Sequence, residues 1–258
     1  MSDQPVLYGV SDGIATISLN RPHKMNTFNE AMFRELNAAV ANFRDDDSAQ
    51  VAILTATGDG AFSAGLDIDA GQAWVQGDLS RSTEFELDFL DSDLDGKPVI
   101  FACFGHCVGQ AAALGGWADI RIAADDTLLS LPEAKIGISA VTLPGLLTEL
   151  LGASQAAYAL LYGGSLNAQW GLRAGLFHEV VPRKELHARA REIAVEMARQ
   201  APLASRAHKM LLRATQNMPK EEVLELGLQH RQKTLTSEDF KEGMQAFLEK
   251  RPARFKGM

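Results

Sequence analysis

Hydrophobic and polar positions along the chain follow two different periods. Residues 13–19 alternate apolar and polar side chains as a half-buried strand does, whereas Val51–Ala56 and Pro98–Ala102 are continuous apolar runs typical of buried strands. Between them, Asn29 is a helix cap for a stretch in which apolar residues recur every three or four positions as far as Arg44. Strands that alternate with helices in this way predict an α/β fold.

Beyond Gly137 the pattern becomes helical almost throughout, apart from a short strand predicted over Phe177–Val181. A helix is also predicted earlier, around Thr83–Leu94. The helices expected after Gly137 are Leu143–Leu151, Ser154–Leu161, Ala168–Arg173, Lys184–Gln200, Leu203–Thr215, Lys220–Thr234 and Glu238–Glu249. The C-terminal ones carry wide apolar stripes, which predict packing against another subunit. We therefore divide the chain into a core of residues 1–200 and a helical oligomerisation region of residues 201–258.

Composition and charge narrow the possible partners. The formal charge is −8, from 25 basic and 33 acidic residues, which opposes binding to nucleic acids and to anionic membranes. No apolar run approaches the roughly 18 residues of a membrane span, and the first ten residues lack the features of a signal peptide. The two cysteines, Cys103 and Cys107, are expected to be buried thiols in a reducing compartment, without a metal site. These features predict a cytoplasmic protein.

The clearest chemistry lies between residues 97 and 137. A buried strand reaches a glycine turn, and Gly109 then opens a short helix of small residues. The start of a helix offers unpaired N–H groups and a positive dipole end, which suit a developing oxyanion. Glu133 follows in an apolar setting that favours its protonated form and allows proton exchange near neutral pH. One carboxylate beside an oxyanion site is what enolate chemistry requires.

Four segments together, in this order and at this spacing, resemble the crotonase (enoyl-CoA hydratase/isomerase) superfamily. They are NRPHKMNTFN at 20–29, AFSAGLDI at 61–68, the 97–137 stretch with its SLPEAKIGI ending, and SEDFKEGMQAFLEKRPARFKG near the C-terminus. The resemblance implies a crotonase-type ββα-spiral core and a C-terminal helical region that drives assembly into a homotrimer or hexamer. It also implies an acyl-CoA substrate, with coenzyme A present only as part of that substrate and no separate cofactor.

The resemblance assigns roles to individual positions. The backbone N–H groups of Leu66 and Gln110 would bind the thioester oxygen as it becomes an enolate, and Glu133 would be the acid/base. The usual triple glycine is replaced here by Gly109, Gln110 and Ala111, although a backbone donor does not depend on its side chain. One such donor contributes about 3–4 kcal/mol to transition-state stabilisation.

Coenzyme A contacts follow from the same resemblance. The matching positions are Lys24, Ala64 and Asp67, together with Phe255 and Lys256 from a neighbouring subunit. For Asp67 the capping of a helix after the loop is an alternative role. The acyl pocket is expected between Ile68 and Leu94, where Trp74, Phe85 and Phe89 either line it or belong to the core.

Ala113 discriminates among the possible reactions. Hydratases that resemble this chain carry a second glutamate there, and the two carboxylates hold a water between them. Other branches of the superfamily carry an acidic residue eight positions after Glu133, where this chain has Val141. A single carboxylate predicts an isomerase that removes a proton from C2 of a 3-enoyl-CoA and returns it at C4. An enoyl-CoA hydratase and a non-catalytic acyl-CoA-binding protein are the alternatives, whereas the negative charge opposes an RNA-binding relative.

Overall fold

The computed structural model describes residues 4–67, 69, 71–72, 87–90 and 92–258 of the chain. Within these residues, a large sheet has the strand order β1 (Val6–Ser11), β2 (Ile14–Leu19), β3 (Val51–Ala56), β5 (Val99–Cys103), β7 (Ile120–Ala124) and β10 (Glu179–Val181). β1 runs antiparallel to β2, and the other neighbouring strands are parallel. A small sheet has the order β4 (Ala61–Ser63), β6 (His106–Val108), β8 (Leu128–Ser130) and β9 (Ser165–Asn167), of which β9 is antiparallel to β8.

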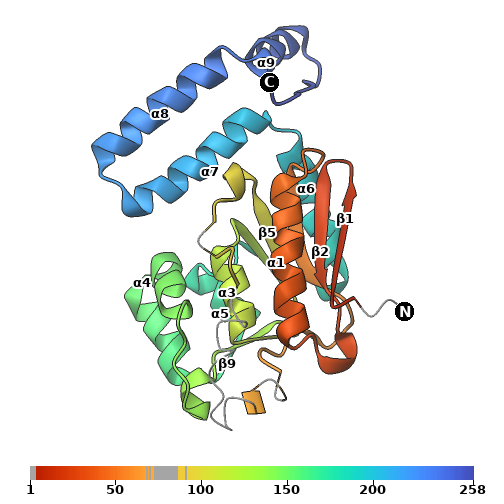
Figure 1. The fold of residues 1–258 in the computed structure, drawn as a ribbon, viewed down its shortest axis with the longest axis vertical. Helices are drawn as coiled ribbons and strands as arrows, with labels where there is room; N and C mark the ends of the chain where they lie inside the picture. Colours follow the sequence, from red (N-terminus) through yellow and green to blue (C-terminus); the bar gives the residue numbers. More distant parts are fainter. Residues whose placement is uncertain (1–3, 68, 70, 73–86, 91) are drawn as a thin grey trace.

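Helices on both faces explain why the strands of the large sheet are so apolar. Every residue of β3 and β5 is buried, as their continuous apolar runs predicted. The helix α1 (Glu30–Asp45) lies in front of the sheet in Figure 1, and α6 (Leu186–Ala198) lies behind it. The half-buried state expected for residues 13–19 is wrong, because β1 extends the sheet beyond β2 while α1 and α6 both contact β2. Only Thr16 of β2 is not fully buried.

Repeated passages between the sheets build the core. In the described part of the chain, β3 leads into β4, β5 into β6, and β7 into β8. After β6 the chain enters α3 (Gln110–Trp117), in which residues 111–117 are buried. This is the ββα spiral that the resemblance implied, so the α/β fold class is confirmed. Because β4, β6 and β8 are parallel neighbours, the residues that follow them meet at one edge of the small sheet.

Most of the helices follow the predicted ranges. The two helices expected before Gly163 form one element, α4 (Leu143–Tyr162), which is kinked at Gly152, where φ is 71° and ψ is 161°. The others are α5 (Ala168–Ala174), α7 (Pro202–Asn217), α8 (Lys220–Leu235) and α9 (Glu238–Glu249). None of the helices in the described ranges has the length and hydrophobicity that a bilayer span requires.

The helix predicted around Thr83–Leu94 is wrong where the structure describes it. Residues 87–90 form a turn, and a 3-10 helix, η3 (Leu94–Gly96), follows. Leu94 and Asp95 have φ values of 55° and 53°, a left-handed backbone that cannot continue an α-helix. Residues 83–86 and 91 lie outside the described part.

The C-terminal helices stand away from the two sheets. In Figure 1, α7 and α8 lie side by side above the sheets, and α9 lies beyond them with the C-terminus. A buried contact ties α7 to the core, because Lys209 donates to the carbonyl of Lys97 at 2.7 Å and to Asp119 Oδ2 at 2.8 Å. The assignment of residues 201–258 to oligomerisation stays a prediction.

Candidate active site

The loop after β4 presents the amide of Leu66. Phe28 and Leu66 form an isolated parallel bridge, in which the Phe28 amide donates to Gly65 O at 2.8 Å and the Asp67 amide donates to Phe28 O at 2.9 Å. Successive peptide groups of an extended segment point to opposite sides, so the N–H of Leu66 points away from Phe28. Among the described residues this N–H has no hydrogen-bond acceptor.

Gly65 brings this loop against the strand that carries the second donor. Its φ is +86°, and a Cβ at this position would lie 3.0 Å from the carbonyl oxygen of Val108. The side-chain oxygen of Ser63 accepts the Gly65 amide at 3.1 Å, which fixes the turn. Glycine is therefore required both for the backbone conformation and for the close approach to β6.

The second donor is the amide of Gln110, the first residue of α3. Gly109 precedes it with φ 56° and ψ −120°, a conformation that only glycine adopts readily, and its amide donates to Ser130 O at 2.9 Å. A first-turn amide has no acceptor within its own helix, and it lies at the positive end of the helix dipole. The start of α3 therefore supplies an anion-stabilising N–H beside β8.

Glu133 lies directly against this helix start. It begins the 3-10 helix η4 (Glu133–Ile136), and its Oε1 would be 2.7 Å from a Cβ on Gly109. Its Oε2 is buried and has no hydrogen-bond partner in the described part of the chain. Burial raises the pKa of Glu133, the direction expected from an apolar setting, and a backbone hydrogen bond opposes this rise only in part.

The structure thus brings Leu66, Gln110 and Glu133 to one edge of the small sheet. Two backbone donors and one carboxylate can stabilise an enolate and move a proton. Ala113 lies in α3, fully buried in the core, and supplies no second carboxylate. Val141 is 93% exposed in this chain.

Two of the residues expected to contact coenzyme A border the Leu66 loop. The Ala64 amide donates to Met25 O at 3.0 Å, which joins this loop to the 3-10 helix η1 (Pro22–Lys24). Lys24 is exposed, and its Nζ lies 4.0 Å from Asp69 Oδ2. Their contact with coenzyme A stays a prediction.

The side chain of Asp67 is already engaged within the chain. Its Oδ2 accepts from Arg21 and from Thr27, each at 3.0 Å, and its Oδ1 accepts the Asp69 amide at 3.1 Å, as a helix cap does. Burial raises the pKa of this carboxyl, but the hydrogen bonds outweigh it, and the net pKa is lowered. The geometry matches the alternative role of Asp67.

Phe255 and Lys256 lie elsewhere in the single chain. The Lys256 amide donates to Asp239 Oδ1 at 2.7 Å, and the ring of Phe255 lies over Gly243, so both residues pack on α9. The structure does not bring them to Glu133 within one chain, and their predicted contribution across a subunit interface stays a prediction. Of the aromatic residues expected near the acyl group, Phe89 is buried against Trp117 at a ring distance of 4.6 Å, whereas Trp74 and Phe85 lie outside the described residues.

Sequence reasoning missed Asn26, which organises the turn before the Leu66 loop. Asn26 is fully buried with φ 53°, and its Nδ2 donates to the carbonyls of Thr57 and Ala61, both at 3.0 Å. Its Oδ1 accepts the Arg21 amide at 2.7 Å. The available signal was turn chemistry, because asparagine tolerates a left-handed backbone and bonds to nearby main-chain groups.

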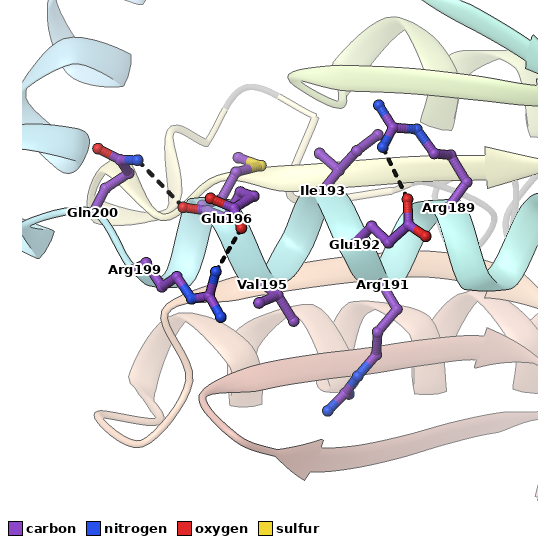
Figure 2. Close-up of a pocket in the computed structure, with 9 residues that line it drawn as sticks. Arg189, Arg191, Glu192, Ile193, Val195, Glu196, Arg199 and Gln200 are labelled. Atoms are coloured by element: carbon purple, nitrogen blue, oxygen red, sulfur yellow. Dashed lines mark hydrogen bonds and ion pairs between the residues drawn. The ribbon is translucent and has the colours of Figure 1, made fainter. Parts of the chain in front are cut away.

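A surface hollow of about 690 Å³ lies along α6 and is not this site (Figure 2). Arg189 and Arg199 on its wall pair with Glu192 and Glu196, as the dashed lines show, so they are not free for an anionic ligand. The residues that line it belong to residues 189–200, which include none of the three groups of the site. In the described ranges, no group of three His, Cys, Asp or Glu side chains is placed to hold a metal ion.

Comparisons with known proteins agree with the fold. The sequence model of a family described as "Enoyl-CoA hydratase/isomerase" matches residues 9–258. A carnitinyl-CoA dehydratase from Citrobacter koseri is 37% identical over 95% of both chains. The solved structure of a probable enoyl-CoA hydratase/isomerase from Mycobacterium abscessus has a TM-score of 0.90 and 29% identity over 98% of this chain and 99% of its own. An enoyl-CoA hydratase from Bacillus anthracis has a TM-score of 0.90 and 29% identity over 99% and 100%.

Proposed function

Because this chain belongs to the enoyl-CoA hydratase/isomerase family, whose members act on acyl-CoA substrates, we propose that it converts 3-enoyl-CoA to 2-enoyl-CoA. The observation that carries the proposal is the carboxylate of Glu133, half-buried beside the start of α3, with Ala113 in α3 at the position of a second acid. One carboxylate is sufficient to move a proton between two carbons, and no water has to be activated.

In the proposed reaction, ionised Glu133 removes a proton from C2 of the 3-enoyl thioester. The electron pair of that C–H bond becomes delocalised over the dienolate, and negative charge grows on the thioester oxygen. The N–H groups of Leu66 and Gln110 stabilise this charge, each by about 3–4 kcal/mol if it resembles other oxyanion donors. The carboxyl then returns the proton to C4, so the product is an isomer and Glu133 is ionised again.

The raised pKa of Glu133 supports this exchange. A carboxyl with a pKa closer to neutral is both a stronger base and a group that can hold the proton between the two steps. Its unpaired Oε2 leaves one oxygen free of competing hydrogen bonds within the described part of the chain.

We extend the proposal to the assembly, a homotrimer or a dimer of trimers. Apolar side chains are strongly exposed on the C-terminal helices, with Leu224 at 65%, Phe247 at 80% and Leu248 at 75%. Exposed apolar side chains of this kind favour an interaction with another molecule, for which we propose further copies of this chain. A neighbouring subunit would then bring Phe255 and Lys256 to coenzyme A, near Lys24 and Ala64. Light scattering after gel filtration measures the molar mass, and a monomer would contradict this part of the proposal.

The test uses trans-3-hexenoyl-CoA and trans-2-hexenoyl-CoA, each incubated with the wild-type protein and with Glu133→Gln. Migration of the double bond without a change of mass, seen by proton NMR and mass spectrometry and lost in Glu133→Gln, is the expected result. Glutamine keeps the shape of the side chain but cannot accept the proton. Undiminished isomerisation by Glu133→Gln would remove Glu133 from the mechanism.

Water addition or loss is the second candidate, because the carnitinyl-CoA dehydratase from Citrobacter koseri is 37% identical over 95% of both chains. In that case Oε2 of Glu133 would hold the water alone. A gain of one water by the 2-enoyl thioester, without double-bond migration in the 3-enoyl thioester, would establish this reaction in place of isomerisation. Binding of both thioesters without turnover would instead indicate the acyl-CoA-binding alternative.

A further inference from the structure

Three corners of the chain control where the groups of the site lie. In the described part of the chain, residues 57–60 join β3 to β4, residues 104–105 join β5 to β6, and residues 125–127 join β7 to β8. Each corner leads through a strand of three residues to one of the groups of the site: Leu66, Gln110 and Glu133. A shift of one corner therefore moves one group of the site relative to the other two.

The middle corner contacts the first corner, and it also contacts β4 and β8, the strands that follow the first and third corners. The Phe62 amide donates to Phe104 O at 2.9 Å, and the Leu128 amide donates to Gly105 O at 2.8 Å. Gly105 has φ +54°, and its Cα packs so closely on the carbonyl of Gly60 that no side chain fits between them. The middle corner takes part in each of these contacts, which join it to the first corner, to β4 and to β8.

The guanidinium of Arg183 contacts all three corners at once. Its Nη2 donates to Asp59 O at 3.2 Å in the first corner, and its Nη1 donates to Asp126 Oδ2 at 3.2 Å in the third. Its Cζ lies 3.5 Å from the centroid of the Phe104 ring in the middle corner. In addition, the Arg183 amide donates to Asp125 Oδ1 at 3.1 Å, which fixes the backbone from which the side chain extends.

A planar cation is suited to this position. The ring of Phe104 is fully buried, and the guanidinium stacks on its face while the N–H groups point outwards in the plane. Lysine keeps the charge but has neither the flat face nor the fork of donors, so it cannot make the three contacts together. Arg183 has an exposed fraction of 26%, which agrees with a partly sheltered group that touches several segments.

We propose that Arg183 is a positioning residue that holds the amides of Leu66 and Gln110 and the carboxylate of Glu133 at their mutual distances. A kinetic test of this role rests on the proposed function, because it measures isomerisation. Hydrogen exchange tests the three corner contacts without any substrate. Arg183 acts through the corners and does not touch the substrate. Because catalytic geometry is sensitive to displacements of about 1 Å, loosening the corners should lower kcat more than it raises KM.

The experiment compares Arg183→Lys with Arg189→Lys in the full-length protein. Arg189 is a matched control, because it also forms ion pairs, at 2.7 Å with Glu179 and at 3.0 Å with Glu192, but it lies on α6 and makes no hydrogen bond to the three corners in the described part of the chain. For isomerisation of trans-3-hexenoyl-CoA we expect Arg183→Lys to lower kcat by about 10- to 100-fold with KM changed less than about threefold. Arg189→Lys should keep kcat within about twofold, since it weakens only the surface ion pairs with Glu179 and Glu192.

Amide hydrogen exchange of the substrate-free protein provides the second readout. In Arg183→Lys we expect faster exchange in all three segments 57–63, 104–110 and 125–131, and in Arg189→Lys no change there. Asp126→Asn weakens the Arg183 contact to the third corner and alters the side chain whose Oδ1 accepts the Gly105 amide at 3.3 Å, so we expect faster exchange mainly in segments 104–110 and 125–131. This variant also keeps the question answerable if Arg183→Lys proves poorly folded.

The outcomes separate the two proposals. A wild type that isomerises, with Arg183→Lys indistinguishable from Arg189→Lys in kcat and exchange, overturns the role of Arg183. A wild-type protein that does not isomerise the thioester overturns the proposed function. In that case the positioning role of Arg183 is judged from hydrogen exchange alone. Faster exchange in the three segments of Arg183→Lys supports the positioning role of Arg183, and exchange unchanged from wild type overturns it.

Discussion

Substitution of Gly109 by alanine probes the contact on which the proposed chemistry depends. Gly109 forms the cap of α3, and the added methyl group would be built 2.7 Å from Oε1 of Glu133. Contacts between carbon atoms and oxygen atoms at this distance are repulsive, and Cδ of the same glutamate would lie 3.7 Å from the added carbon. The carboxylate therefore has to move away from the helix start, or the helix start has to move.

Two effects set the magnitude. Alanine at φ 56° and ψ −120° costs about 1–3 kcal/mol of backbone strain, and the upper end applies because this conformation is rarer than the left-handed helical one. For a chain of this size, 1 kcal/mol corresponds to about 2–4 °C in Tm, so we expect a fall of up to about 10 °C. Displacement of the carboxylate by about 1 Å should lower kcat about 100-fold in addition.

The assay measures Tm and kcat for isomerisation side by side, with Gly175→Ala as the matched control. Gly175 follows α5 with φ +85°, and among the described residues, its chain neighbours aside, no atom lies within 4 Å of a Cβ built there. Its alanine variant should lose about 1–2 kcal/mol of stability from the left-handed backbone and keep kcat within about twofold. The comparison separates backbone strain from displacement of Glu133.

Wild-type kcat in Gly109→Ala, with the protein folded, would refute this reasoning. It would mean that the position of the Glu133 carboxylate against α3 does not matter for the chemistry. An equal loss of kcat in Gly175→Ala would refute it differently, because general destabilisation would then explain both variants.

Three further predictions concern charged groups. Burial raises the pKa of Glu133 above its ordinary 4.5, so the folded state binds this proton more tightly than the unfolded state, and ionisation of Glu133 lowers the free energy of unfolding as the pH rises above 4.5. In urea unfolding, Glu133→Gln should therefore be more stable than wild type at pH 7 and equally stable below pH 4.5. Wild-type kcat/KM should fall as the pH is lowered through the raised pKa. Asp67→Asn should lower the free energy of unfolding by about 1.5–3 kcal/mol at pH 7, because the lowered pKa of Asp67 shows that the fold stabilises its ionised form. The difference in this free energy between variant and wild type should shrink as the pH falls below 3.8. A difference that persists in acid would contradict stabilisation by the charge of Asp67. Lys209→Met removes the ion-pair partner of Asp119 at 2.8 Å and should lower the free energy of unfolding by about 3 kcal/mol. Lys241→Met breaks an exposed ion pair and should lower it by less than about 1 kcal/mol. Equal urea midpoints for the two variants would show that the contact of Lys209 in α7 with Asp119 does not stabilise the protein.

The functional site was partly readable from the chain. Gly65 and Gly109 stand out as glycines in turn positions, and both have the positive φ values that make glycine necessary. The raised pKa of Glu133 was expected from its apolar neighbours and follows from burial. The contacts of Asn26 and Arg183 were not predicted, because their partners lie in segments that only the fold brings together.

Local periodicity determined the long elements of this protein. The buried strands β3 and β5 and the amphipathic helix α1, capped by the side chain of Asn29, were predicted because each repeats its pattern over enough residues to define a period. Tertiary structure alone decided the three-residue strands β4, β6, β8 and β9 and the edge strand β1. Three residues are too few to show a period, and such a strand exists only through hydrogen bonds to distant neighbours. The active-site edge is built from those strands, so its geometry was settled by long-range pairing and not by local sequence.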